Sequence, residues 1–157
     1  MRAGKFIVGV MFLLLTCLTA QGSVMDTRSS PHARLQTVGL KDVRWTNGFW
    51  ADRFRLLQSA TIPSIREALQ DPDNAAKLRN LRVAAGLEEG QHRGNRWSDG
   101  DCYKYLEAMA AVYAVTGDEE LDRRLDRWIQ VIKKAQCEDG YIASQIGCDP
   151  EKRFPRP

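Results

Sequence analysis

Apolar and polar residues follow a helical spacing along most of the chain, most clearly between residues 101 and 136. The segment 119–136 carries one apolar stripe, formed by Leu121, Leu125, Trp128, Ile129 and Ile132. The segment 101–116 has a broader apolar face, formed by Tyr105, Leu106, Met109, Ala110, Val112 and Tyr113. Gly117 is typical of a helix end, and Asp118 is typical of a helix start. This pattern predicts two helices whose apolar faces form the core. Their short connection makes them antiparallel neighbours.

The pattern before residue 100 predicts shorter elements. Segment 38–45 has the composition of a short strand, and segment 49–71 has helical spacing with a kink or restart at Pro63. Segment 73–97 contains several glycines, which favour a short helix followed by a polar loop that includes His92. A lone histidine of this kind is more often a surface residue than a ligand.

The start of the helix predicted at residue 101 allows two interpretations. Ser98 followed by Asp101 has the spacing of a capping box, with Asp in place of the usual Glu or Gln. Acidic residues also suit the positive end of a helix dipole. Alternatively, the polar residues at this start face a ligand pocket, and both interpretations stay open at this point.

The predicted helix pair also has a geometric consequence for the pocket hypothesis. Because the two helices are antiparallel, the start of the first and the end of the second lie at the same end of the pair. Polar and aromatic residues of segments 99–104 and 138–141 therefore converge, as in many polar-ligand sites. The candidate substrate contacts are Asp99, Asp101, Lys104 and Asp139, with Tyr103 and Tyr141 as stacking or hydroxyl partners.

Composition and charge narrow the class of protein. The chain has 157 residues, of which 43% are hydrophobic, and this fits one globular domain. A net charge of +3, without a basic run, a zinc-finger spacing or a phosphate loop, argues against a nucleic-acid partner.

The N-terminus has the features of a signal peptide over residues 1–22. A basic start is followed by an apolar run, residues 6–18, and then by small residues that allow cleavage before Ser23. The run is short for a membrane span, so we expect export to the periplasm or the extracellular space and no stable membrane insertion after cleavage. An uncleaved anchor and lipidation at Cys17 are minor alternatives. Residues 23–37 are polar and predict a flexible mature N-terminus.

The remaining cysteines are Cys102, Cys137 and Cys148. Cys137 and Cys148 flank a predicted turn and can form a disulfide in an oxidising compartment, although small buried thiols fit the pattern equally well. The sequence has no Cys-x-x-Cys pair or Cys/His cluster, so this chain offers no recognisable zinc site of its own.

Three segments resemble the N-terminal part of glycoside hydrolase family 127, which contains β-L-arabinofuranosidases. They are Phe49-Trp50, residues 99–108 (DGDCYKYLEA) and residues 136–142 (QCEDGYI). The spacing between the second and third segments matches the family pattern, which usually has leucine where this chain has Ile142. The resemblance covers roughly residues 40–157.

The resemblance implies an all-α (α/α)6 toroid followed by a β-sandwich, acting on terminal β-L-arabinofuranose. It also implies a retaining mechanism with a cysteine nucleophile held by zinc, whose ligands are three cysteines and a glutamate, and another glutamate as acid/base. Nothing in this sequence matches those motifs, which lie downstream in the family. We therefore expect segment 38–157 to be an incomplete, inactive N-terminal part of the catalytic domain, without catalytic residues or metal ligands, ending in an unstructured proline-rich tail.

Two other functions fit parts of the pattern. Another α/α-toroid enzyme, such as an unsaturated-uronyl hydrolase or a polysaccharide lyase, shares the Asp-Gly-Tyr motif. A non-catalytic helical binding module of the repeat type would show self-similarity at a fixed period. Segments 45–70 and 101–136 share no such register, which argues against a repeat module.

Overall fold

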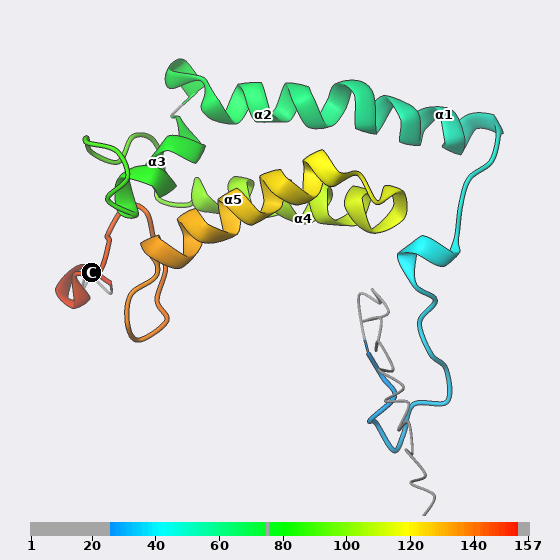
Figure 1. The fold of residues 1–157 in the computed structure, drawn as a ribbon. Helices are drawn as coiled ribbons and strands as arrows, with labels where there is room; N and C mark the ends of the chain where they lie inside the picture. Colours follow the sequence, from blue (N-terminus) through cyan, green and yellow to red (C-terminus); the bar gives the residue numbers. More distant parts are fainter. Residues whose placement is uncertain (1–25, 75, 154–157) are drawn as a thin grey trace, which may run out of the picture.

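The computed structural model describes residues 26–74 and 76–153, and every regular element in them is helical (Figure 1). The α-helices are α1 (Gly48–Leu56), α2 (Ile62–Gln70), α3 (Lys77–Ala84), α4 (Asp99–Thr116) and α5 (Glu119–Ala135). None of the described helices combines the length and the apolar composition that crossing a membrane requires. The expected signal peptide, including Cys17, lies outside the described residues.

The prediction of a strand at residues 38–45 is wrong. A short 3-10 helix, η1 (Leu40–Asp42), occupies this segment, and its flanking valines, Val38 and Val43, are exposed. A strand must exchange backbone hydrogen bonds with a neighbouring strand, and the described part of the chain contains no such partner. The β-branched composition alone is therefore not sufficient to form a strand here.

The helix expected at residues 49–71 is confirmed as a nearly continuous rod made of α1, a π-helical segment and α2. Pro63 lies in the first turn of α2, where its missing N–H is tolerated. The π-helical segment, η2 (Leu57–Thr61), stands directly before it and changes the hydrogen-bond spacing. After α2, Asp71 turns to an extended conformation before a proline, as residues in that position prefer.

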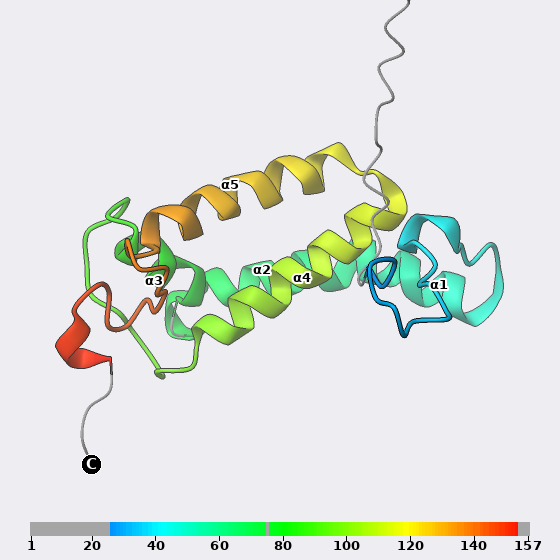
Figure 2. The same ribbon diagram turned by 90° about the horizontal axis from the view of Figure 1, so that it is seen from below.

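The antiparallel pair of α4 and α5 is confirmed as well (Figure 2). Gly117 adopts a left-handed conformation with φ of 68°, and its N–H donates to the carbonyl oxygen of Tyr113 at 2.8 Å. The carboxylate of Asp118 accepts hydrogen bonds from the backbone N–H groups of Glu120 at 2.8 Å and Leu121 at 3.3 Å. These contacts satisfy backbone groups that a helix end otherwise leaves unpaired.

Of the two interpretations of the helix start, the capping box of Ser98 and Asp101 is wrong. The helix α4 begins at Asp99, and Ser98 has helical dihedral angles, with φ of −63° and ψ of −24°. A capping residue needs an extended backbone to bring its oxygen to the free N–H groups. The Ser98 side chain is instead buried and lies 3.4 Å from Nε2 of His92.

The hydrophobic core surrounds α4, which packs against α2, α3 and α5. Its buried members are Ile62, Leu69, Leu78, Leu81, Cys102, Tyr105, Met109, Val112, Leu121, Leu125 and Val131. The stripe predicted on α5 is therefore correct except at one edge, because Ile129 is 52% exposed while Val131 is buried. Ile129 lies about a quarter-turn of helix beyond Trp128, on the side away from α3 and α4.

Candidate functional site

Two cavities lie at the end of the helix pair where α4 begins and α5 ends. The first, of about 200 Å³, is named here the Asp101 cavity and is lined by Asp73, Asn74, Lys77, Gly94, Asn95, Trp97, Ser98 and Asp101. The second, of about 460 Å³, is the Tyr141 cavity and is lined by Arg96, Tyr141, Ala143, Gln145, Ile146, Glu151, Lys152 and Arg153. Arg96 and Trp97 are neighbours in the chain, so the loop before α4 contributes to both cavities.

The carboxylate of Asp101 is held at the edge of its cavity by Lys77. The ammonium nitrogen Nζ of Lys77 lies 2.8 Å from Oδ2 of Asp101. This hydrogen bond is the main reason why the pKa of Asp101 lies below its ordinary value, and the positive charges of Lys77 and Lys104 act in the same direction. Asp101 is therefore ionised at neutral pH, and its partly exposed oxygens can accept hydrogen bonds from sugar hydroxyl groups.

Trp97 is the aromatic residue of the Asp101 cavity, and its side chain is 75% exposed. An indole ring offers a large flat apolar surface that normally finds a packing partner in a folded protein. The apolar face of a sugar ring is one surface that fits it. Sequence reasoning did not assign Trp97 to the site, although a tryptophan within a polar loop was an available signal.

Asp99 connects the start of α4 to the segment that follows α5. Its Oδ2 accepts a hydrogen bond from the backbone N–H of Ser144 at 2.7 Å, and its Oδ1 accepts one from the Ser144 hydroxyl. The residue is only 9% exposed and lines neither cavity. The contact confirms that the two segments meet at one end of the helix pair, and it gives Asp99 a positioning role.

Arg153 contacts both Asp139 and Tyr141 at the Tyr141 cavity. Its guanidinium group donates to both carboxylate oxygens of Asp139, with Nη2 3.2 Å from Oδ1, and it lies 4.2 Å from the centre of the Tyr141 ring. The hydrogen bond from Arg153 lowers the pKa of Asp139. The Nε of Arg153 is buried without a hydrogen-bond partner in the described part of the chain, and the residue lines the cavity.

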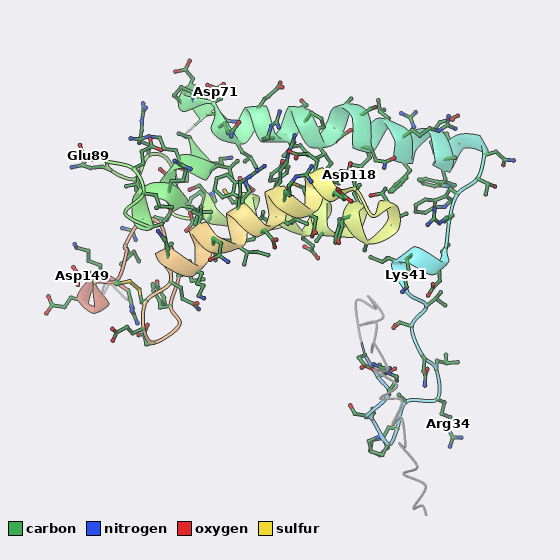
Figure 3. All side chains as sticks on the ribbon, viewed as in Figure 1. Arg34, Lys41, Asp71, Glu89, Asp118 and Asp149 are labelled. Carbon is green, nitrogen blue, oxygen red and sulfur yellow. A yellow bond between two sulfur atoms is a disulfide. The ribbon has the colours of Figure 1, made fainter. Side chains whose placement is uncertain are left out.

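The tail expected to be unstructured is therefore ordered up to Arg153. Residues Pro150–Lys152 form a 3-10 helix, η4, which carries Arg153 back to Asp139 (Figure 3, beside the label of Asp149). The prolines of the tail predict a break in structure, and no sequence pattern links Arg153 to Asp139. A 3-10 turn tolerates proline at its first position, since that residue needs no N–H donor.

The remaining two candidate residues lie on α4 outside both cavities. The hydroxyl of Tyr103 is buried without a hydrogen-bond partner in the described part of the chain, and burial raises its pKa to about 12. Lys104 is exposed. The structure thus places Asp101 and Tyr141 in separate cavities and gives Asp139 a different partner from Asp101. A substrate shared by these residues stays a prediction.

The cysteines do not form a metal site in the described residues. Cys137 and Cys148 form a disulfide, which decides between the two alternatives for this pair. Cys102 is fully buried, and burial, followed by the nearby charge of Asp99, raises the pKa of its thiol to about 12. Residues 26–74 and 76–153 contain no group of three or more His, Cys, Asp or Glu side chains arranged to hold a metal ion.

The described part of the chain is thus all-α, with polar cavities at one end of the helix pair. Residues 42–153 match the family described as beta-L-arabinofuranosidase, GH127 catalytic domain. The chain therefore belongs to glycoside hydrolase family 127, as the sequence motifs indicated.

Two relatives illustrate this membership. The non-reducing end beta-L-arabinofuranosidase of Bifidobacterium longum subsp. longum is 32% identical, over 64% of this chain and 18% of the relative. The crystal structure of a GH127 beta-L-arabinofuranosidase from Geobacillus stearothermophilus T6 superimposes with a TM-score of 0.66 at 32% identity, over 71% of this chain and 18% of that chain. The all-α fold is confirmed, and its helix arrangement is consistent with part of an α/α toroid. The chain spans about a fifth of the length of either relative.

Proposed function

We propose that the protein hydrolyses terminal β-L-arabinofuranosyl residues of plant-type glycans, and that residues 26–153 supply part of the wall of its substrate site. Family membership and the activities named for both relatives support this proposal. The observation that carries it is the junction of Asp99 with Ser144, which joins the motif at residues 99–108 to the segment directly after the motif at residues 136–142.

The cavities supply groups that suit a sugar. Asp101 offers a carboxylate for hydroxyl groups, Trp97 offers a flat ring, and Arg153 offers a guanidinium group beside Tyr141. Charged hydrogen bonds of this kind fix the orientation of a polar ligand, and an aromatic surface removes its apolar face from water. The described residues therefore act in binding and orientation within this proposal.

The proposal assigns the bond-breaking step to other parts of the polypeptide. The proposal gives Cys102 no role as a nucleophile because the thiol is fully buried and burial raises its pKa to about 12, and the other two described cysteines form a disulfide. The described residues also do not fit the zinc site that family resemblance implies, and no step is derived through it. We accordingly expect residues 23–157 alone to release no arabinose from an aryl β-L-arabinofuranoside.

The test uses Asp101→Asn and Asp139→Asn in the whole protein. Loss of a charged hydrogen bond to substrate costs about 1.5–3 kcal/mol, so kcat/KM for an aryl β-L-arabinofuranoside should fall about ten- to a hundredfold. Asp126→Asn, on the exposed side of α5, is the matched control and should keep full activity. Melting temperatures separate a binding effect from a folding effect. Unchanged turnover in both site variants would reject the assignment of these residues to the substrate site.

Export is a second part of the proposal. The basic start with Arg2 and Lys5, the apolar run and the small residues before Ser23 support it. Mass spectrometry of the protein outside the cytoplasm should show a chain that starts near Gln21 or Ser23. A mature protein that still begins at Met1 would contradict cleavage.

A further inference from the structure

A third cavity, of about 230 Å³, lies between α2, α3 and α5 and shares no residue with the two cavities described above. Its lining residues come from four helices and are Arg66, Gln70, Arg82, Tyr105, Arg124, Arg127, Trp128 and Val131. We name it the arginine groove. Figure 3 shows side chains in the space between α2 and α5. Four guanidinium groups and no carboxylate line it.

The carboxylates of α5 neutralise this charge only in part. Nε of Arg124 lies 2.7 Å from Oε1 of Glu120, and Nη2 of Arg127 lies 3.5 Å from the same oxygen. One carboxylate therefore serves both arginines from outside the groove. The other nearby acids of the helix, Asp122 and Asp126, act on Tyr113, about half a turn around α5 from the groove.

The other two arginines are also incompletely paired. Glu88 interacts with Arg82 at 3.3 Å, but it makes its shorter contact, of 2.5 Å, with Arg79. Arg66 makes no ion pair with any residue of the described part of the chain. The groove thus holds more positive charge than its surroundings compensate.

The buried side of the groove carries Tyr105, whose hydroxyl is a further hydrogen-bond donor near the arginines. Tyr105 is 3% exposed, and burial raises the pKa of its phenol, whereas the positive charges of Arg66 and Arg124 lower it. Two guanidinium groups from different helices therefore lie near the same phenol. Like charges gathered in a partly enclosed space repel one another more strongly than they do in water. An anion between them would remove this repulsion.

We propose that the arginine groove binds a small oxyanion, either a free phosphate-type ion or the carboxylate of an acidic sugar. Guanidinium groups match both oxyanions because their planar N–H donors form paired hydrogen bonds with two oxygens. Arg66 supplies such donors from α2 and Arg124 supplies them from α5, and Trp128 provides an apolar wall. The groove would thus serve a ligand other than the terminal sugar proposed for the first two cavities.

The experiment titrates the whole protein with sodium phosphate and, separately, with sodium galacturonate at low ionic strength and pH 7. Sodium chloride at equal ionic strength is the reference, and calorimetry measures the dissociation constant. Saturable binding of either probe supports the proposal, and the probe that binds more tightly distinguishes the two sources of the anion. The tryptophan fluorescence of the protein should change at the same concentrations, because Trp128 lines the groove, and Trp128→Phe should remove this change.

Substitutions inside and outside the arginine groove test whether the anion binds there. Arg66→Gln should weaken it about ten- to a hundredfold, because a charged hydrogen bond is lost. Lys133→Gln removes the same charge from an exposed position of α5 and should change it less than twofold. If Arg66→Gln fails to fold, Arg127→Gln replaces it, because that side chain is 65% exposed. No saturable binding of either probe, or an equal loss in Lys133→Gln, would overturn the proposal.

Discussion

The contact between Asp99 and Ser144 permits a sharp test of what holds the candidate site together. Asp99→Ala removes the acceptor of two hydrogen bonds and leaves a buried backbone N–H of Ser144 without its partner. Ser144→Ala removes only the hydroxyl donor and keeps the 2.7 Å bond from the backbone N–H. The two substitutions therefore differ by one defined hydrogen bond.

The structure sets the expected order of the effects. A hydrogen bond to a charged group contributes about 1.5–3 kcal/mol. Ser144→Ala should lower the free energy of unfolding by about this amount. Asp99→Ala should lower it by about 3–5 kcal/mol, since both bonds are lost in a site that is nearly closed to water. The double variant should cost little more than Asp99→Ala alone, which gives a coupling energy above about 1 kcal/mol.

Urea denaturation of the whole protein and hydrogen exchange of the Ser144 amide measure these effects. The amide should lose its protection in Asp99→Ala and keep most of it in Ser144→Ala. The control is Asp52→Ala, which breaks an exposed pair with Arg55 and should cost less than about 1 kcal/mol. The reasoning is refuted if Asp99→Ala costs no more than this control, or if the effects of the two site substitutions simply add.

Three further outcomes follow from the contacts at the two cavities. Lys77→Gln should raise the pKa of Asp101 toward its ordinary value, and NMR of the carboxyl carbon measures this change. Because the ion pair lowers this pKa, the pair stabilises the fold at neutral pH, and this stabilisation is lost as the pH falls below about 4. The stabilities of the variant and the parent should converge there. Trp97→Ala should change the free energy of unfolding by less than about 0.5 kcal/mol but lower kcat/KM about two- to tenfold. A loss of stability without a loss of activity would contradict the proposal that a sugar ring stacks on Trp97. Replacing both Cys137 and Cys148 by serine should cost about 3 kcal/mol in urea denaturation, and no cost would mean that the loop is ordered without the disulfide.

The parts of the fold that the sequence predicted are those with a strong local pattern. The helix pair of α4 and α5 combines long apolar stripes with a glycine end and an aspartate start, and both signals act within a few residues. The failures at residues 38–45 and at Ser98 have a common cause. A strand depends on a distant partner, and a cap depends on backbone angles that the neighbouring loop imposes.

The candidate site was predicted less completely because its contacts span long stretches of sequence. Lys77 lies 24 residues before Asp101, Ser144 lies 45 residues after Asp99, and Arg153 lies 14 residues after Asp139. No periodicity links such partners. Antiparallel geometry indicated that segments 99–104 and 138–141 meet, but it could not show which carboxylates would turn inward and which would pair with a cation.

The disulfide between Cys137 and Cys148 has a consequence for where the protein matures. The loop that it closes carries Tyr141 and Ser144, which contribute a cavity wall and the junction with α4. Newly made chains in a reducing cytoplasm keep these cysteines as thiols, and the loop then retains far more conformational freedom. The helices can form before that bond, whereas closing it restricts the loop that carries Tyr141. Under the proposed export, this loop is closed only once the chain has reached an oxidising compartment.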